Sequence, residues 1–210
     1  MDFWLPKIES GEPDYVDKLA MKIRTEQGIG LAAFAAVFNQ ELTEVLMVQL
    51  GDYAKKHYGG NPWTLPGGGV EKGERPSVAV KREIKEECHF EVQESLQLAG
   101  WFARPYYQSR YAKNKGEIVL VFTCRSKSPA ATATPSPPEI IAARFQPFCV
   151  HEWLNVPSQG TSEHSLQPLP KHWVYWADAA RLALRENHMT QWSYATAADM
   201  AKRPDPIKPI

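Results

Sequence analysis

Apolar residues gather in runs of strand length, with polar turns between them. These runs are residues 31–38, 45–50, 96–107, 117–124 and 139–148. The first two are separated only by the polar turn 39–44, so they are expected to form neighbouring buried strands. The run EIVLVFTC at 117–124 is the clearest core strand. The pattern therefore predicts a sheet as the centre of the protein.

Helical spacing of apolar residues is found on either side of these runs. Pro13 opens a helix near the N-terminus, and Gly28 ends it. Its apolar positions recur at helical spacing: Tyr15, Leu19 and Ile23. Near the C-terminus, the sequence predicts a short helix at residues 151–154 and a long helix with a broad apolar face within residues 169–188.

A third helix is expected to begin at Pro76, because proline suits the first helical turn. Val78 and Ile84, with nearby alanines, give it an apolar side, and Arg82 and several glutamates lie on the other side. Residues 126–138 are rich in Ser, Ala, Thr and Pro and are expected to be a mobile excursion without structure of its own.

Composition narrows the class of protein. The 210 residues suit one generous domain or a domain with extensions, and 43% apolar residues are ample for a core. The formal charge is zero, from 24 basic and 24 acidic side chains, so no nucleic-acid polymer is expected as a partner. No apolar stretch is long enough for a membrane span. With no secretory signal pattern and three cysteines outside any CxxC spacing, the sequence predicts a cytoplasmic protein with reduced thiols.

Candidate chemistry is concentrated between Gly67 and Phe90. Three glutamates of this segment, Glu83, Glu86 and Glu87, stand at i, i+3 and i+4 and so share one face of a helix. Like charges at this spacing repel each other, and a divalent cation relieves the repulsion. Ligands that are all oxygen suit Mg²⁺ or Mn²⁺. The segment therefore points to metal-assisted chemistry at phosphate.

The spacing within this segment resembles the Nudix box. The matching positions are Gly68, Glu74, Arg82, Glu83, Ile84, Glu86, Glu87 and Phe90. The one departure is His89, which stands where the family usually has glycine. Glycine there supplies a left-handed helix cap, and histidine is among the residues that tolerate positive φ best. The substitution is therefore expected to leave the carboxylate face intact.

The resemblance implies the Nudix fold, an α/β/α sandwich with a curved mixed sheet. The resemblance covers about residues 28–184. The Nudix domain is expected to span 28–188, which leaves residues 1–27 as an N-terminal helical extension and 189–210 as a C-terminal tail. In the family such additions often pack on the sheet, form a dimer contact or shape the substrate cleft. A homodimer is therefore a possible assembly.

The resemblance also implies roles for the box residues. Glu83, Glu86 and Glu87 correspond to metal ligands, and the carbonyl of Gly67 is a further candidate because a glycine turn lets the backbone approach a cation. Supporting roles fall to Gly68, to Glu74 and to Arg82, whose guanidinium orients the helix carboxylates while paired with Glu74. Direct contact between Arg82 and a substrate phosphate is the alternative. Cys88, beside these glutamates, is expected to be a packing residue.

The general base is left open by the sequence. Some Nudix enzymes use a box glutamate, for which Glu83 is the candidate, and others use a glutamate from a distant loop. Glu139 is the loop candidate and Glu117 a weaker one. A solvated charge at the end of a strand is the simpler interpretation of Glu139.

Markers of the substrate class contradict each other. Pro105 resembles a marker of ADP-ribose pyrophosphatases, whereas Tyr106 and Tyr107 resemble one of diadenosine polyphosphate hydrolases. Arg104 and the two tyrosines can stack a base and meet a phosphate, or cover the edge of the core. The basic loop 55–57 can meet a polyphosphate tail or simply be solvated.

Together these features predict a Mg²⁺-dependent Nudix hydrolase that cleaves a nucleoside diphosphate linked to another moiety. ADP-ribose or a sugar nucleotide is favoured over dinucleoside polyphosphates and nucleoside triphosphates. A non-catalytic nucleotide-binding module is the alternative from another class, but such proteins typically lose box glutamates, which this chain keeps. Isopentenyl diphosphate isomerisation needs a cysteine in the early strands, and the first cysteine here is Cys88.

Overall fold

The computed structural model describes residues 10, 12–52, 54, 62–92, 96–104, 116–126, 133–155, 171–186 and 193–194. The helices are α1 (Pro13–Gln27), α3 (Pro76–Cys88), α4 (Val150–Asn155) and α5 (Lys171–Glu186). The strands are β1 (Gly30–Phe38), β2 (Glu44–Leu50), β3 (Trp63–Thr64), β4 (Gly67–Gly69), β5 (Gln97–Arg104), β6 (Glu117–Arg125), β7 (Ile140–Pro147) and β8 (Ser193–Tyr194). The predicted strands and helices are therefore confirmed at these positions.

The strands form one mixed sheet, to which the described residues contribute eight strands, and six of them follow the order β3-β2-β1-β6-β5-β8. In addition, β4 pairs with β1 and β7 pairs with β2. Strands β1 and β6 run parallel from Gly30–Glu117 to Phe38–Arg125. By contrast, β1 and β2 are antiparallel and meet only where Phe38 faces Val45. The two runs that the sequence placed side by side therefore diverge, and β4 pairs with β1 in the space between them.

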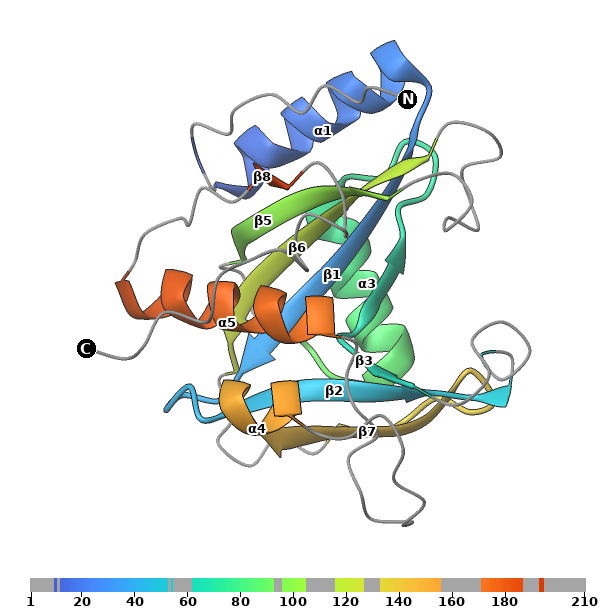
Figure 1. The fold of residues 1–210 in the computed structure, drawn as a ribbon. Coiled ribbons are helices and arrows are strands. Elements are labelled where there is room, and N and C mark those ends of the chain that lie inside the picture. The colour runs from blue at the N-terminus through green and yellow to red at the C-terminus, as the bar shows by residue number, and fades with distance from the viewer. Residues whose placement is uncertain are drawn as a thin grey trace.

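Strands β1 and β6 are buried on both faces, which explains their continuous apolar runs. Odd-numbered residues of β1, such as Leu31 and Val37, pack with α1 and α3, whereas Ala32 and Phe38 pack with α4 and α5. Figure 1 shows α3 behind the sheet and α5 in front of it. The structure is thus the α/β/α sandwich that the sequence predicts.

Helix α3 begins and ends as the sequence predicts. Pro76 lies in the first turn, and His89 follows the last turn in the left-handed conformation, with φ 49° and ψ 33°. Its N–H donates to the carbonyl of Lys85. The expected apolar side is wrong at Val78, which is 51% exposed, while Ile84 is fully buried. Val78 lies in the first turn, on the side of the helix that faces away from the sheet.

Helix α1 packs on the same core as the sheet. Val16, Ala20 and Ile23 are buried against it. Asp17 is 2% exposed and binds Ser77 at the start of α3. The N-terminal extension thus touches the helix that carries the acidic residues.

One expectation about an irregular segment needs correction. Part of the segment 126–138 is not a free excursion: the backbone N–H groups of Thr134 and Ser136 donate hydrogen bonds to the C-terminal end of α3. In the C-terminal tail, Ser193 and Tyr194 form the edge strand β8 beside β5. In the described residues, the structure contains no helix that is apolar and long enough to cross a membrane.

Candidate active site

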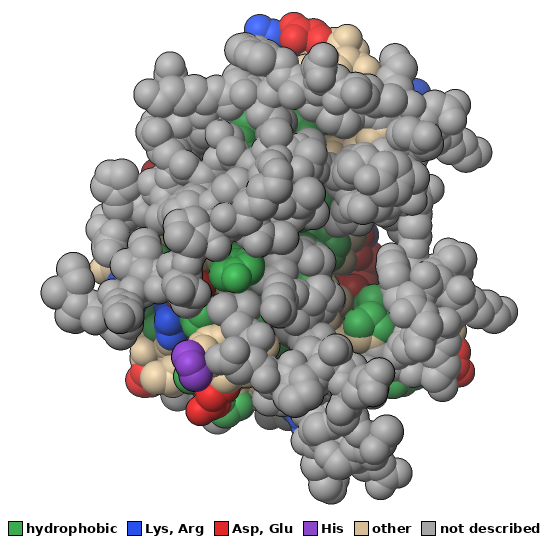
Figure 2. All heavy atoms as spheres, in the orientation of Figure 1, with side chains coloured by type: hydrophobic (Ala, Val, Ile, Leu, Met, Phe, Trp, Pro, Cys, Tyr) green, Lys and Arg blue, Asp and Glu red, His purple; other side chains and the backbone are tan. Residues whose placement is uncertain are grey.

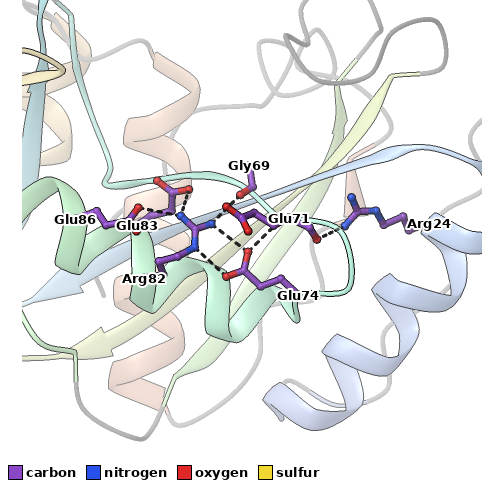
Figure 3. Close-up of polar contacts among 7 residues, drawn as sticks. All are labelled: Arg24, Gly69, Glu71, Glu74, Arg82, Glu83 and Glu86. Atoms are coloured by element: carbon purple, nitrogen blue, oxygen red, sulfur yellow. Dashed lines mark hydrogen bonds and ion pairs between the residues drawn. The ribbon is translucent and has the colours of Figure 1, made fainter.

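Arg82 lies at the centre of the polar cluster formed by the Nudix-like segment. Its Nε and Nη2 donate to the two carboxylate oxygens of Glu74 at 2.9 and 3.0 Å. Its Nη1 donates to Glu83 at 2.9 Å and to Glu86 at 3.0 Å. Its Nη2 also donates to the carbonyl oxygen of Gly69 at 3.2 Å (Figure 3). One guanidinium thus links the glycine turn, the loop before α3 and the carboxylate face of the helix. The pair between Arg82 and Glu74 that the resemblance implies is present.

The glycine turn makes room for the carboxylates of α3. A Cβ atom at Gly68 would stand only 2.8 Å from the carboxylate of Glu83. Gly67 has φ +140°, and a Cβ atom there would collide with the backbone of Ala33 and Phe34 in β1. The N–H of Gly67 donates to the carboxylate of Glu87 at 2.9 Å. Glycine is required at Gly67 because of its positive φ and the nearby backbone, whereas a side chain at Gly68 would displace the carboxylate of Glu83.

Burial and crowding of like charges perturb two of the carboxylates. The pKa of Glu87 is raised to about 8 as a net result: burial is the largest cause, the Gly67 N–H lowers the pKa, and the nearby charges of Glu83, Glu139 and Glu86 raise it. Burial also raises the pKa of Glu83, against the lowering effect of Arg82. Glu86 differs from both, because its side chain is 59% exposed. Acidic groups held together at this cost are typical of functional sites.

Glu139 reaches the same cluster from a distant part of the sequence. It lies in the turn before β7, and its charge raises the pKa of both Glu83 and Glu87. The side chain is exposed, as expected for a solvated position, yet it stands near the helix carboxylates. Glu117, the weaker candidate, is buried at the start of β6 opposite Gly30.

Several candidates cannot be placed. Tyr106, Tyr107 and the basic loop 55–57 lie outside the described residues, and of Arg104 only the backbone, at the end of β5, is described. Their proposed contacts with substrate therefore stay predictions. Cys88 is a fully buried thiol whose pKa is raised by burial, as expected for a packing residue. Trp101 and Phe102 are also buried in the core.

Sequence reasoning missed the contacts that α1 makes with this region. Asp17 binds Ser77, and Nη1 of Arg24 donates to the carbonyl oxygen of Glu71 at 2.9 Å (Figure 3). These residues are separated by 60 and 47 positions along the chain. No local pattern predicts such contacts; the one available signal is that Asp17 interrupts the apolar side of its helix.

The glutamates of α3 are of the chemical type that binds a divalent cation. In their present positions, however, the described residues contain no group of three or more Asp, Glu, His or Cys side chains arranged to hold one. Instead, Arg82 engages Glu83 and Glu86. The fit follows from chemistry: Glu87 is nine-tenths buried and acidic, and the charges around it raise its pKa. A hard cation with oxygen ligands would relieve this crowding. The space-filling view shows acidic side chains at the bottom of a hollow, next to hydrophobic side chains (Figure 2).

The sheet, its two helical layers and the glycine turn facing an acidic helix define a class of metal-assisted hydrolases. Comparison with known protein families gives the class its name, because the family described as NUDIX domain matches residues 29–165. The chain therefore belongs to the Nudix family and is a Nudix-type pyrophosphohydrolase. Hydrolases of this family generally need divalent metal ions and act on nucleotide substrates.

Solved structures agree on the fold. A MutT protein from Methanosarcina mazei Go1 is 21% identical, covers 76% of this chain and 95% of its own, and has a TM-score of 0.51. A MutT NUDIX hydrolase from Burkholderia pseudomallei is 18% identical, with coverages of 72% and 97% and a TM-score of 0.51. The NUDIX domain of Shewanella oneidensis NrtR complexed with ADP ribose is 17% identical, with coverages of 73% and 87% and a TM-score of 0.53. No curated protein matches the sequence.

Proposed function

We propose that the protein hydrolyses the diphosphate linkage of a nucleoside diphosphate joined to another moiety, with ADP-ribose or a sugar nucleotide as the favoured substrate. The observation that carries this proposal is the convergence of Glu83, Glu86 and Glu87 beside the glycine turn, with Glu139 brought to them from the turn before β7. A diphosphate is anionic, so it can approach these carboxylates only if positive charge lies between them.

Mg²⁺ or Mn²⁺ is the cation proposed for this place, held by the three helix carboxylates and the carbonyl of Gly67. When bound, such an ion neutralises phosphate oxygens and lowers the pKa of a coordinated water. Arg82 keeps the carboxylates in position, since it contacts Glu83 and Glu86 while fixed by Glu74. We assign it this role rather than contact with the substrate, because its three nitrogens already donate to protein oxygens.

Glu139 is the residue we propose as general base. The attacking water forms a bond to phosphorus, the bridging P–O bond breaks, and the carboxylate of Glu139 accepts the proton of the water. Glu83 is the less suitable base because it is engaged by Arg82 at 2.9 Å.

The favoured substrate class follows from a sequence marker and from a solved structure of the same fold. The sequence places Pro105 where ADP-ribose pyrophosphatases carry a proline, and a domain of the same fold has been seen with ADP ribose. Arg104, Tyr106 and Tyr107 are proposed to meet the substrate. Dinucleoside polyphosphates and nucleoside triphosphates are the competing substrates.

A substrate screen tests the proposal directly. Purified protein is incubated with ADP-ribose, sugar nucleotides, dinucleoside polyphosphates and nucleoside triphosphates, with Mg²⁺, with Mn²⁺ and with EDTA, and products are identified by mass spectrometry in ¹⁸O-labelled water. We expect AMP and ribose 5-phosphate from ADP-ribose, no reaction in EDTA, and label on one phosphate only. Faster hydrolysis of a triphosphate would overturn the substrate assignment, and hydrolysis that persists in EDTA would overturn the metal-assisted mechanism.

A further inference from the structure

The segment 133–139 is fastened to the C-terminal end of α3. The N–H of Thr134 donates to the carbonyl of Cys88 at 2.8 Å, and the N–H of Ser136 donates to the carbonyl of Glu87 at 3.2 Å. Carbonyl groups in the last turn of a helix have no partner within the helix. The segment therefore completes the hydrogen bonding of the helix that carries the acidic cluster.

A side-chain contact reinforces this junction. Nε2 of His89 and Oγ of Ser136 lie 3.2 Å apart, in hydrogen-bond contact. His89 occupies the left-handed position at which the Nudix box normally has glycine. Glycine has no side chain, so the contact exists only because this chain departs from the family pattern.

Ser136 in turn fixes the turn that holds Glu139. The carbonyl of Ser136 accepts a hydrogen bond from the N–H of Ile140 at 3.0 Å. The carbonyl of Glu139 accepts one from the N–H of Gly51 at 2.7 Å. Any Cβ atom at Gly51 would collide with the carbonyl of Pro138, so the turn lies tightly against the chain after β2. The backbone of Glu139 is thus anchored on one side by Gly51 and on the other by the junction with α3.

We propose that His89 is a positioning residue for Glu139, acting through Ser136. The His89–Ser136 contact holds the turn against the end of α3, so that the carboxylate of Glu139 stands beside Glu83 and Glu87. This inference rests on the proposed role of Glu139 as general base. It assigns His89, the one departure from the Nudix box, a function beyond ending the helix in place of glycine.

The test is the variant His89→Gly, which restores the family residue. Glycine suits φ 49° better than histidine does, so the helix cap is kept and the unfolding midpoint should stay the same or rise. Loss of the contact should lower kcat about three- to tenfold with KM unchanged, because a base out of position slows proton transfer without weakening binding. A merely structural role would move the unfolding midpoint and not kcat.

Ser136→Ala is the second variant, and it leaves the backbone of both segments untouched. It should lower kcat as much as His89→Gly, and the double variant should lose no more than either single variant, since both remove the same contact. Glu91→Gln is the matched control, because Glu91 lies just beyond the same helix end and pairs with Lys85 at 3.0 Å. Its kcat should equal that of the parent.

Amide hydrogen exchange in the metal-free protein supplies a readout apart from activity. His89→Gly should speed exchange at Thr134, Ser136 and Ile140, while the amides of β1 stay protected. Unchanged exchange at these amides overturns the inference whether or not a substrate has been found.

The variant Glu139→Gln separates failure of this inference from failure of the proposed reaction. If it keeps full turnover while Glu86→Gln is inactive, the hydrolase assignment stands and the positioning role falls. If Glu139→Gln is slow but His89→Gly turns over as fast as the parent, His89 is only a cap and the inference is overturned. Additive losses in the His89→Gly, Ser136→Ala double variant overturn it as well.

Discussion

Asp17 of α1 caps α3 from outside that helix. Its carboxylate accepts a hydrogen bond from the N–H of Ser77 at 2.9 Å and another from the hydroxyl of Ser77 at 2.6 Å. Among the described residues, the side chain at the N-cap position itself, Arg75, makes no capping hydrogen bond. A helix whose first N–H groups need acceptors is thus completed by the N-terminal extension.

Asp17→Ala should therefore destabilise the protein. It removes two hydrogen bonds from a site that is 2% exposed, and loss of a helix cap costs about 1–2 kcal/mol. Chemical denaturation should show this loss, and for a domain of this size the melting temperature should fall by about 2–8 °C. Asp14→Ala is the control on the same helix: its exposed pair with Arg75 at 3.6 Å should contribute about half a kcal/mol or less. Equal losses in the two variants would show that the cap is not needed.

Glu86→Gln should separate activity from stability. The side chain is 59% exposed and pairs with Arg82, so its neutralisation should move the unfolding midpoint little. Loss of a metal ligand should lower kcat by at least about a hundredfold, measured at saturating Mg²⁺ with the best substrate of the screen. The control Glu91→Gln changes an exposed glutamate near the same helix end and should keep full activity. Turnover unchanged in Glu86→Gln would remove this side chain from the site.

The free energy of unfolding of the metal-free protein should depend on pH through the ionisation of Glu87. Burial raises the pKa of this acid from 4.5 to about 8, so the folded state holds the proton more tightly than the unfolded state does. The stabilising effect is complete below pH 4.5 and is lost progressively as the pH rises to about 8.

Glu87→Gln tests this dependence because an amide cannot ionise. In EDTA, the variant and the parent should unfold at similar denaturant concentrations near pH 4, where Glu87 is protonated in both states, and the variant should be the more stable of the two at pH 9. The amide oxygen can still accept the hydrogen bond from Gly67 N–H. Parallel stability profiles of the two proteins between pH 6 and 9 would contradict the prediction.

Arg82→Lys should reduce activity although it preserves the charge. The guanidinium contacts Glu74, Glu83, Glu86 and the carbonyl of Gly69 at the same time, and an ammonium group cannot match this planar arrangement. Misplaced carboxylates should lower kcat by about 10- to 100-fold and weaken Mn²⁺ binding, measured by titration. Arg24→Lys is the matched control, because Arg24 makes a single hydrogen bond to Glu71 that lysine can replace. Similar losses in both variants would argue against the guanidinium geometry as the cause.

Local signals were sufficient for much of this structure. Apolar runs and helix boundary residues located the strands and helices, and the left-handed conformation at His89 followed from its place after the last turn of α3. These features depend on neighbours within a few positions, which a sequence displays directly. Val78 was misplaced because the side of a helix that meets the sheet is set by packing and not by hydrophobicity alone.

The box residues and their spacing were determined by the sequence itself, since one helical turn brings Glu83, Glu86 and Glu87 together wherever the helix lies. Only the tertiary structure decided that Asp17 caps this helix and that Glu139 stands beside its carboxylates. Both contacts join segments more than fifty residues apart. Their formation depends on how strands and helices pack into layers, and no periodicity along the chain records that packing.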